Sequence, residues 1–377
     1  MADIDRILIV GGGIAGLTVA AALQQKGFAA ELVEREQTWP TGGAGIAVQP
    51  NGMRVLNALG TGAAVERAGA VIRQWGFCDQ QGEVLCETDL QALWGSDAPF
   101  IGIERSKLHR ALVAGAASTS HRLGTSLVSL SQESRRVTVG FSDGSTGEYD
   151  LLIGADGISS TVRKLALSQA SPDYLGAMNW RSIAPIRPGG LTALRFILGD
   201  HCFFGLCPVG EGRTYGFGYV MQPRFYDPVK GRLERLRERF AAFGGVVQEY
   251  LTSLGCDDEV ICSAIERIDV DEWHSGRIVL IGDAAHASSP LMGQGGCMAM
   301  EDAFVLAETL RAATTPEAAL NEYVIRRKPR VSWVQQQSLA TGEALGLPPA
   351  IRNAALRERG ERMMESRFRP LASCDRI

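Results

Sequence analysis

Short, uninterrupted apolar runs occur near the start, the middle and the last third of the chain. They are residues 7–10, 151–153 and 278–281, and a glycine follows each of them at once. Apolar runs of this length are typical of strands that are buried on both faces of a parallel sheet. We therefore expect an α/β protein in which three glycine-marked turns lie at the ends of buried strands.

The first run opens a predicted βαβ unit. A helix is expected from Ile14 to about Lys26, with Leu17 and Leu23 on its buried side, and a second strand over residues 29–34. The switch from a continuous apolar run to helical spacing directly after the glycines is the pattern of a strand that turns into a helix.

The glycines of this unit fit a turn that binds a dinucleotide. Gly11 permits the tight turn, Gly13 lets a diphosphate approach the backbone, and Gly16 lets helix and strand pack closely. The first amides of the helix point at the phosphates, and an acid at the end of the second strand accepts hydrogen bonds from a ribose. The motif does not by itself separate FAD from NAD. The cofactor contacts predicted here are Gly11, Gly13, Ile14, Ala15, Gly16, Glu34 and Arg35.

A second corner of acid and glycine follows the middle run. Residues 135–141 and 146–153 predict a hairpin around residues 142–145, and its second strand leads into Asp156 and Gly157. An acid and a glycine after an apolar strand are equally consistent with an ordinary turn.

The last run ends at Asp283 and is followed by a glycine-rich loop, residues 290–296, and a helix from Cys297 to about Leu310. This arrangement places amide groups and a helix dipole where a reduced flavin carries negative charge. The plain alternative is a loop whose glycines are needed only for packing.

In this order the three motifs resemble those of the flavin-dependent aromatic hydroxylases. These are the single-component (group A) monooxygenases with the para-hydroxybenzoate hydroxylase fold. The motifs are residues 11–16, 156–157 and 282–286, and the resemblance covers about residues 4–340. It implies a Rossmann-like FAD-binding domain with an inserted antiparallel-sheet substrate domain.

The resemblance also assigns roles to single residues. Asp156 and Arg163 match a fingerprint between the FAD diphosphate and the path of the nicotinamide, and Asp283 matches the residue that binds the ribityl chain. Gly45 lies in a segment that passes beneath the flavin, and Arg105 matches an arginine that touches FAD. The loop after the third motif adds Pro290, Gly293, Gly295 and Gly296.

The same resemblance predicts how the chain divides into domains. The C-terminal part after Thr315 is expected to form helices that are interrupted near Pro329 and at Pro348 and Pro349. The predicted ranges are 1–75, 98–169 and 263–340 for a discontinuous FAD-binding domain, 76–97 and 170–262 for the substrate-binding sheet, and 341–377 for a C-terminal helical segment.

Two predicted strands of the substrate sheet, residues 201–209 and 214–220, carry candidate substrate contacts. Alternate side chains of a strand share a face, so Tyr215 and Phe217 lie on the same side. These aromatic rings either form core or face the substrate, and both interpretations are open. The predicted substrate contacts are Arg181, Phe203, Tyr215, Phe217 and Pro290.

The local pattern of residues 179–180 and 295–302 is similar to that of the bacterial urate hydroxylases. Those enzymes carry a tyrosine where Tyr215 stands, but an arginine that grips urate where Phe203 aligns. The difference favours an aromatic substrate that is less polar than urate. Arg181 and Arg195 are candidates to anchor an acidic substituent, or else they face solvent.

The activity that the resemblance implies is hydroxylation of an aromatic or heteroaromatic small molecule by FAD, O₂ and transiently bound NAD(P)H, through a flavin C4a-hydroperoxide. The cofactor performs the difficult chemistry, so neither a triad nor a metal site is expected, and Tyr215 is the candidate catalytic residue. Two alternatives are a reductase or oxidase of the same fold that does not hydroxylate, and a flavin-binding protein without turnover.

Composition adds limits on partners and location. The chain has 377 residues and a formal net charge of −4, which gives no reason to expect nucleic acid or an anionic membrane as partner. Its eight cysteines include no CxxC pair, and neither a signal sequence nor a membrane-spanning run is present. We therefore expect a cytoplasmic monomer or homodimer.

Overall fold

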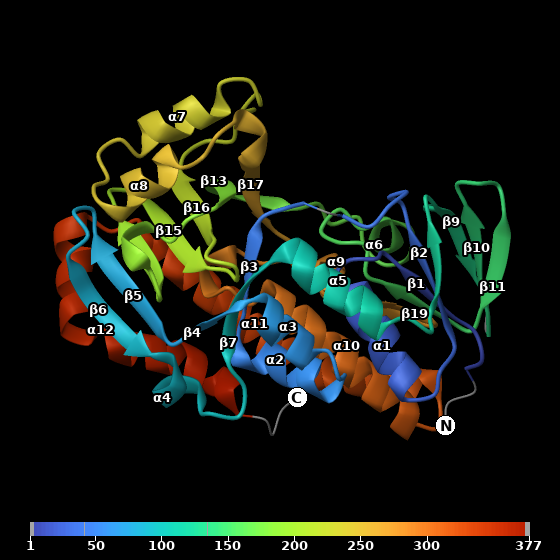
Figure 1. The fold of residues 1–377 in the computed structure, drawn as a ribbon. Helices are drawn as coiled ribbons and strands as arrows, with labels where there is room; N and C mark the ends of the chain where they lie inside the picture. Colours follow the sequence, from blue (N-terminus) through green and yellow to red (C-terminus); the bar gives the residue numbers. More distant parts are fainter. Residues whose placement is uncertain (1–3, 41, 134, 374–377) are drawn as a thin grey trace.

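The computed structural model describes residues 4–40, 42–133 and 135–373, and it places all three apolar runs side by side in one six-stranded sheet (Figure 1). The sheet is parallel except for its last pair, β18 and β19. Because parallel strands end at the same edge, the three glycine motifs meet there. In spatial order the strands are β18 (His274–Ser275), β19 (Ile278–Leu280), β12 (Leu151–Gly154), β1 (Ile7–Val10), β2 (Ala30–Glu34) and β8 (Ser120–Leu123).

Helices pack on this sheet and against one another. The helix after β1 is buried from Ile14 to Leu23, because it lies between the sheet and the helix that follows the third motif. The helices of this part are α1 (Ile14–Gln25), α2 (Pro50–Ala58), α3 (Gly62–Ala68), α5 (Arg105–Gly115), α6 (Thr161–Ala166), α9 (Asp283–His286), the 3₁₀ helix η3 (Pro290–Met292) and α10 (Gly295–Ala312).

Two small antiparallel sheets flank the parallel one. The predicted hairpin is present, but its second strand ends at Tyr149 and the chain then enters the parallel sheet as β12. The strands of the two small sheets are β9 (Leu127–Gln132), β10 (Val137–Phe141) and β11 (Thr146–Tyr149), and β3 (Gly45–Val48), β7 (Phe100–Glu104) and β4 (Ala70–Ile72).

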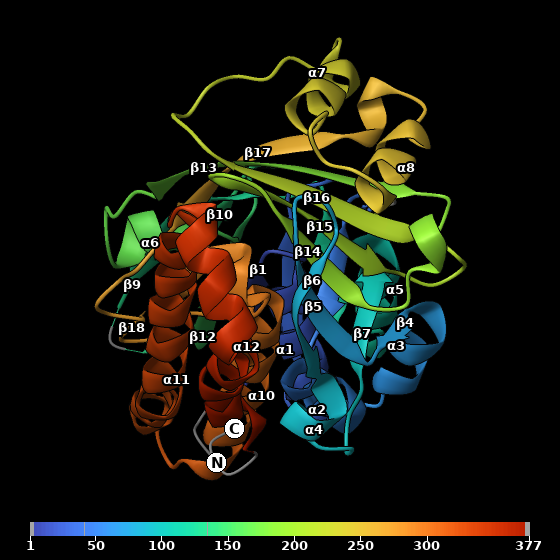
Figure 2. The same cartoon turned by 90° about the vertical axis from the view of Figure 1, so that its left-hand side faces the viewer.

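A seven-stranded sheet lies across the upper part of the molecule, with α7 and α8 on its outer face (Figures 1 and 2). Its strands, in spatial order, are β17 (Ile261–Arg267), β13 (Asp173–Ala184), β16 (Thr214–Met221), β15 (Cys202–Pro208), β14 (Leu194–Leu198), β5 (Gln74–Asp79) and β6 (Val84–Asp89). Its helices are α7 (Arg232–Arg239), α8 (Val246–Thr252), η1 (Pro188–Gly190) and η2 (Asp257–Glu259).

The seven-stranded sheet is mixed, whereas the sequence predicted an antiparallel one. Strand β14 pairs with β5 in parallel, and the other five neighbouring pairs are antiparallel. The chain leaves this sheet after β6 and returns only at β13, and so long a connection allows two strands to join in parallel. The sheet also takes in residues 74–75 and 263–267, which lie outside the predicted ranges. The division into domains stays a prediction.

The described C-terminal part after Thr315 contains two helices, α11 (Pro316–Leu345) and α12 (Pro349–Ala372), which run side by side in Figure 2. The short helix α4 (Leu90–Trp94), from an earlier segment, packs against α12. The interruption predicted at Pro329 is wrong, because α11 passes through it. Proline removes the hydrogen bond to the carbonyl four residues earlier, which belongs to the exposed Ile325, and buried ion pairs on both sides of Pro329 hold the helix. None of the helices in the described ranges is long and apolar enough to cross a membrane.

Candidate active site

The first glycine turn is shaped by close backbone contacts. Gly11 has φ +106°, and a Cβ on it would lie 2.5 Å from the carbonyl oxygen of Ala155. A Cβ on Gly16 would overlap the carbonyl oxygen of Gly11. A Cβ on Gly13, in contrast, would meet nothing within 4 Å. Gly11 and Gly16 therefore allow strand, turn and helix to pack closely, and Gly13 faces open space at the helix N-terminus.

The predicted acid of this unit contacts the turn itself. Glu34 Oε2 accepts a hydrogen bond from the amide of Gly12 at 2.6 Å, and its Oε1 accepts one from the amide of Glu36 at 3.0 Å. Arg35 is exposed and pairs with Glu36 at 3.4 Å. The carboxylate of Glu34 thus stands at the entrance of the turn, and a direct contact of Arg35 with the cofactor stays a prediction.

Two aromatic side chains that the sequence analysis did not predict, His109 and Trp39, support the first glycine turn. His109 Nε2 donates to the carbonyl oxygen of Gly12 at 2.8 Å, and the ring of Trp39 packs on His109 with centroids 5.3 Å apart. Burial lowers the pKa of His109, so the neutral ring that donates one N–H is favoured. Neither residue lies in a motif, so spacing carries no signal for them.

The second motif is held together by its own side chains. Asp156 accepts hydrogen bonds from the Ser160 hydroxyl and from the amides of Thr161 and Val162, and so caps α6. Arg163 is fully buried and donates to the carbonyl oxygens of Ile158 at 2.7 Å and Ala284 at 2.8 Å.

Through these contacts Arg163 ties the second motif to the third. Neither Asp156 nor Arg163 lines the central cavity, although their neighbours Ala155, Gly157 and Ile158 do. The structure thus gives both side chains a positioning role, and their direct contact with a cofactor stays a prediction.

The third motif presents an acid and a loop to the cavity. Asp283 is the exposed first residue of α9. Gly295 lies close to it, since a Cβ on Gly295 would be 4.0 Å from Asp283 Oδ1. Gly293 has φ +62°, which favours glycine. Pro290, Gly293, Gly295 and Gly296 all line the cavity, and their contact with a flavin stays a prediction.

A buried cluster of charged side chains lies beneath this loop. Glu301 and Asp302 of α10 and Arg327 of α11 are fully buried, and Arg330 and His286 are nearly so. Arg327 donates to Asp302 Oδ1 at 2.8 Å and to Glu301 Oε2 at 2.5 Å, and Arg330 donates to Glu301 at 2.7 Å. His286 Nε2 donates to Asp302 Oδ2 at 2.6 Å.

Cationic side chains contact both buried carboxylates, and the ionisation of these carboxylates follows from those contacts. Burial by itself raises the pKa of a carboxyl group, but His286 and Arg327 outweigh it and lower the pKa of Asp302 to about 2. Arg327 and Arg330 likewise lower the pKa of Glu301. Both carboxylates are therefore ionised at neutral pH.

A chain of amide side chains extends the cluster to α2. Asn51 donates to Glu301 Oε1 at 2.7 Å and to Gln294 Oε1 at 2.9 Å, and Gln294 donates to Gln49 Oε1 at 2.8 Å. Gln49 in turn donates to the carbonyl oxygen of Met292 at 2.7 Å. The loop over residues 290–296 is thus fixed from both sides.

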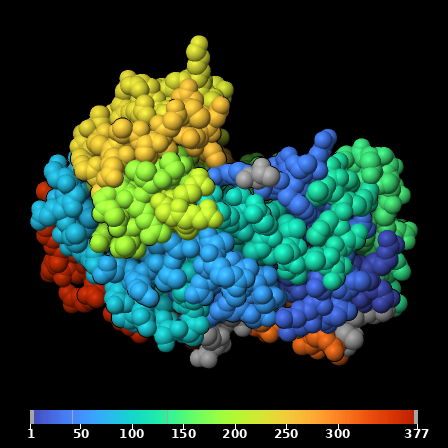
Figure 3. Space-filling view, viewed as in Figure 1, coloured from blue at the N-terminus to red at the C-terminus, as the bar shows by residue number. Residues whose placement is uncertain are grey.

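The central cavity has a volume of about 590 Å³ and lies between this loop and the seven-stranded sheet. Figure 3 shows the molecule hollowed between the part that carries α7 and α8 and the part that carries β9–β11. Predicted residues that line the cavity are Gly13, Ile14, Ala15, Gly45, Arg105, Arg181, Phe203, Tyr215, Phe217, Asp283, Pro290, Gly293, Gly295 and Gly296. Those that do not are Gly11, Gly16, Glu34, Arg35, Asp156 and Arg163.

The roof of the cavity is graded from polar to aromatic. Asn179 and Arg181 of β13 lie at one end, beside β17, and Arg181 donates to Ser263 Oγ at 3.3 Å. Phe203 and Phe217 lie farther along the sheet, with ring centroids 6.1 Å apart. Arg195 faces away from the cavity and pairs with Glu87, so it is not a substrate anchor of this cavity.

Tyr215 lies between these two ends and close to the predicted flavin segment. Its ring packs on Gly45, where a Cβ would overlap it, and on Phe217, with centroids 5.0 Å apart. Burial raises the pKa of Tyr215 to about 12, although the charges of Arg181 and Arg105 oppose the rise. The phenol is therefore protonated at neutral pH and presents an O–H group to the cavity.

These features define the class of protein. A dinucleotide turn, an acid at the end of the third strand and an amide-rich loop surround a cavity large enough for an isoalloxazine ring and a substrate, which is the site of an FAD-dependent enzyme. The FAD binding domain family matches residues 5–338. The chain belongs to this family.

Similar proteins agree with that assignment. The aurachin C monooxygenase/isomerase of Stigmatella aurantiaca is 34% identical over 86% of each chain. An FAD-dependent urate hydroxylase of Klebsiella pneumoniae is 32% identical, again over 86% of each chain. The structure of Klebsiella pneumoniae HpxO with FAD and uric acid is similar, with a TM-score of 0.90, 28% identity, and coverage of 98% of this chain and 97% of that one. The predicted class, an FAD-dependent aromatic monooxygenase with the para-hydroxybenzoate hydroxylase fold, is confirmed.

Replacing Asp283 by alanine tests the predicted contact of this residue with FAD. Loss of one charge-assisted hydrogen bond weakens binding by roughly tenfold or more, so D283A is expected to purify with little yellow cofactor. Asp269→Ala, at another exposed aspartate, serves as control and should retain it. The flavin-to-protein absorbance ratio is the measurement, and full occupancy of D283A would contradict the assignment.

Replacing Asp302 by asparagine tests the buried cluster. Removing one partner of a buried pair costs about 3–5 kcal/mol, whereas the exposed Asp258→Asn should cost almost nothing. The native pKa of Asp302 lies below the ordinary value of 3.8, so its contribution is present above that value and is lost as the pH falls toward about 2. Urea unfolding of the wild type should show this acid loss, and D302N should lack it.

Proposed function

We propose that this monooxygenase uses NAD(P)H and O₂ to hydroxylate a largely apolar aromatic or heteroaromatic ring. The observation that carries the proposal is the roof of the cavity, where Phe203, Phe217 and Tyr215 lie opposite the glycine loop. An apolar, water-excluding wall on one side and polar backbone groups on the other suit a flat, weakly polar substrate beside a flavin.

The residues present fit FAD. Gly13 leaves the N-terminus of α1 open to a diphosphate, and Gly295 leaves the N-terminus of α10 open to the ring system. FAD supplies the oxygen-activating chemistry when it is bound. Arg105 and Asp283, both lining the cavity, are proposed to contact it, and Arg105 adds a positive charge close to the predicted ring position.

The names of relatives support an aromatic substrate without selecting one. They include enzymes for urate, for 3-amino-4-hydroxybenzoate and for a heptyl quinolone. Phe203 is 2% exposed and stacks on Tyr219 with centroids 4.9 Å apart, so this part of the wall offers no charge to a polar heterocycle. We therefore favour a substrate less polar than urate, with Arg181 and Pro290 as further contacts.

Tyr215 is proposed to orient the substrate and to exchange a proton with its hydroxyl or ring nitrogen. Its phenol is protonated at neutral pH and lies among the charges of Arg181 and Arg105, which favour a transient phenolate. A substrate hydroxyl that donates its proton to a transient Tyr215 phenolate would gain electron density in the ring, which favours electrophilic attack.

A substrate panel tests the reaction. Purified protein is expected to oxidise NAD(P)H faster in the presence of one compound among phenols, benzoates, hydroxypyridines, purines and polyketide-like aromatics. The same compound should gain one oxygen atom by mass. Turnover that persists without O₂ would instead favour a reductase.

Replacing Tyr215 by phenylalanine tests the proton-transfer role. The ring contacts with Gly45 and Phe217 remain, so Y215F should retain FAD, while hydroxylation should fall by about 100-fold, the lower range for general acid–base catalysis. Product formation per NAD(P)H consumed is the measurement. Tyr226→Phe, at an 84% exposed tyrosine, is the control, and unchanged turnover in Y215F would remove the role.

A further inference from the structure

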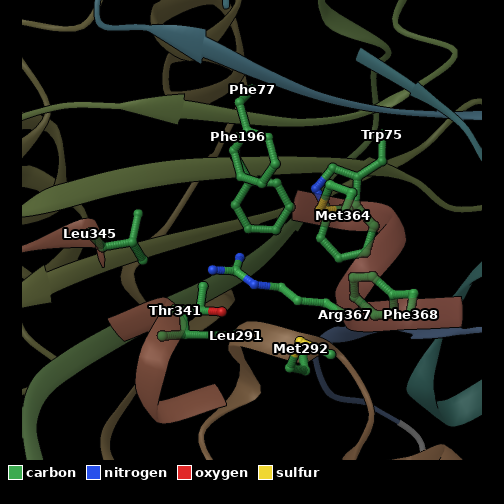
Figure 4. Close-up of a pocket in the computed structure, with 10 residues that line it drawn as sticks. All are labelled: Trp75, Phe77, Phe196, Leu291, Met292, Thr341, Leu345, Met364, Arg367 and Phe368. Carbon is green, nitrogen blue, oxygen red and sulfur yellow. The ribbon is translucent and has the colours of Figure 1, made fainter. Parts of the chain in front are cut away.

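A second, much smaller pocket lies behind the aromatic end of the cavity. It forms where α12 meets β5 and β14 of the sheet and the η3 turn of the glycine loop (Figure 4). Three side chains, Trp75, Phe196 and Leu291, line both this pocket and the central cavity. The two spaces are therefore separated only by the thickness of these side chains.

One charged side chain, Arg367, lines this mainly apolar pocket. Figure 4 shows the side chain of Arg367 extended from α12, with its guanidinium below the ring of Phe196. Within residues 4–40, 42–133 and 135–373, no acidic side chain pairs with it. Burial is the only cause that lowers the pKa of Arg367. The backbone carbonyl of Arg367 accepts a hydrogen bond from Trp333 Nε1 at 3.1 Å, so this turn of the helix is fixed.

A second donor without a partner lies in the same wall. Trp75 is 4% exposed, and in the described part of the chain its buried Nε1–H has no hydrogen-bond acceptor. Its indole stacks on Phe196 with centroids 5.4 Å apart and an interplanar angle of 8°. The hydroxyl of Thr341, in contrast, already donates to the carbonyl oxygen of Gln337 at 2.7 Å.

A half-buried cation without a counter-ion is costly, as is a buried donor without an acceptor. Both costs are removed if one group brings negative charge and acceptor oxygens together. The pocket has a volume of about 20 Å³, which is room for a small terminal group but not for a ring. A carboxylate fits this description, and the ring that carries it would remain on the cavity side of Phe196.

We propose that Arg367, with the indole N–H of Trp75, binds the acidic end of an elongated substrate whose aromatic ring lies in the central cavity. The inference rests on the proposed function, and it narrows the substrate to aromatic acids in which an apolar linker joins the ring to a carboxylate. In this proposal the ring of Phe196, one of the three side chains between the two spaces, moves aside for the linker.

Arg181 is the competing anchor for an acid, and it lies at the other end of the seven-stranded sheet from the pocket of Arg367. Arg181 lies on β13, near one edge of the seven-stranded sheet, whereas Trp75 lies on β5, near the other. An acid bound by Arg181 needs no linker, but an acid bound by Arg367 does. The dependence of affinity on linker length therefore distinguishes the two sites.

The test compares ω-phenylalkanoates, from phenylacetate to 5-phenylpentanoate, with their neutral amides. Dissociation constants are measured by calorimetry on the holoenzyme without NAD(P)H, so that no turnover is needed. A charge-assisted pair that is lost costs on the order of tenfold in affinity or more. Wild-type protein is expected to prefer the longer acids over their amides by that factor, and Arg367→Gln should abolish the preference.

Matched variants make the result specific. Arg367→Lys should recover part of the preference, and Arg362→Gln, at an exposed arginine of the same helix, should leave it unchanged. Arg181→Gln is expected to weaken acid and amide equally. Trp75→Phe keeps the stack and removes the N–H, and should lower the preference even if Arg367→Gln folds poorly.

Two results would overturn the inference. One is an acid preference that survives in Arg367→Gln, and the other is a preference that is absent in the wild type or lost in Arg181→Gln instead. If acids bind as expected but no compound is hydroxylated, the proposed function fails while the anion site stands. If hydroxylation occurs without any acid preference, the anion site fails alone.

Discussion

The site depends above all on the neutralisation of two fully buried carboxylates by two arginines. Glu301 and Asp302 stand on α10, directly after the glycine loop, and Arg327 and Arg330 reach them from α11. Buried pairs of this kind contribute little net stability compared with apolar packing, but breaking them is severe. Their effect here is therefore geometric: α10 has one position against α11 in which all four charges are paired, and the loop that forms the floor of the cavity starts from that position.

The glycine motifs work under a related steric constraint, because three strand ends must approach one another closely. Gly11 and Gly16 leave no space for a side chain, and Arg163 then bridges two motifs through carbonyl oxygens rather than through another side chain. Backbone-to-backbone distances of this kind tolerate little variation. The residues that hold the cofactor turn are consequently distinct from those that face the cavity, such as Gly13 and Asp283.

The sequence predicted what local pattern determines and missed what tertiary partners determine. Each apolar run followed by glycine is a strand of one sheet. Burial on both faces and a tight turn both depend on residues that are adjacent in the sequence, so a local pattern predicts them. The partner of Glu301 is 26 residues away on another helix, and no spacing rule selects it. Trp39 and His109 support the first turn from separate segments, and Pro329 was misread because propensity does not register the ion pairs around it.

In the roof of the cavity, side chains from elements far apart in the sequence also determine which substrate can bind. The face of its sheet toward the cavity carries Arg181 at one end and the stacked Trp75 and Phe196 at the other. A flat ring is favoured by either half, and a further cation, Arg367 of α12, lies behind the aromatic half. Because the glycine loop fixes the floor and α12 fixes that cation, the distance between a reacting ring and a bound acid is set by the packing of α12 on the sheet. Selectivity for linker length then follows from the position of α12, the helix that carries Arg367.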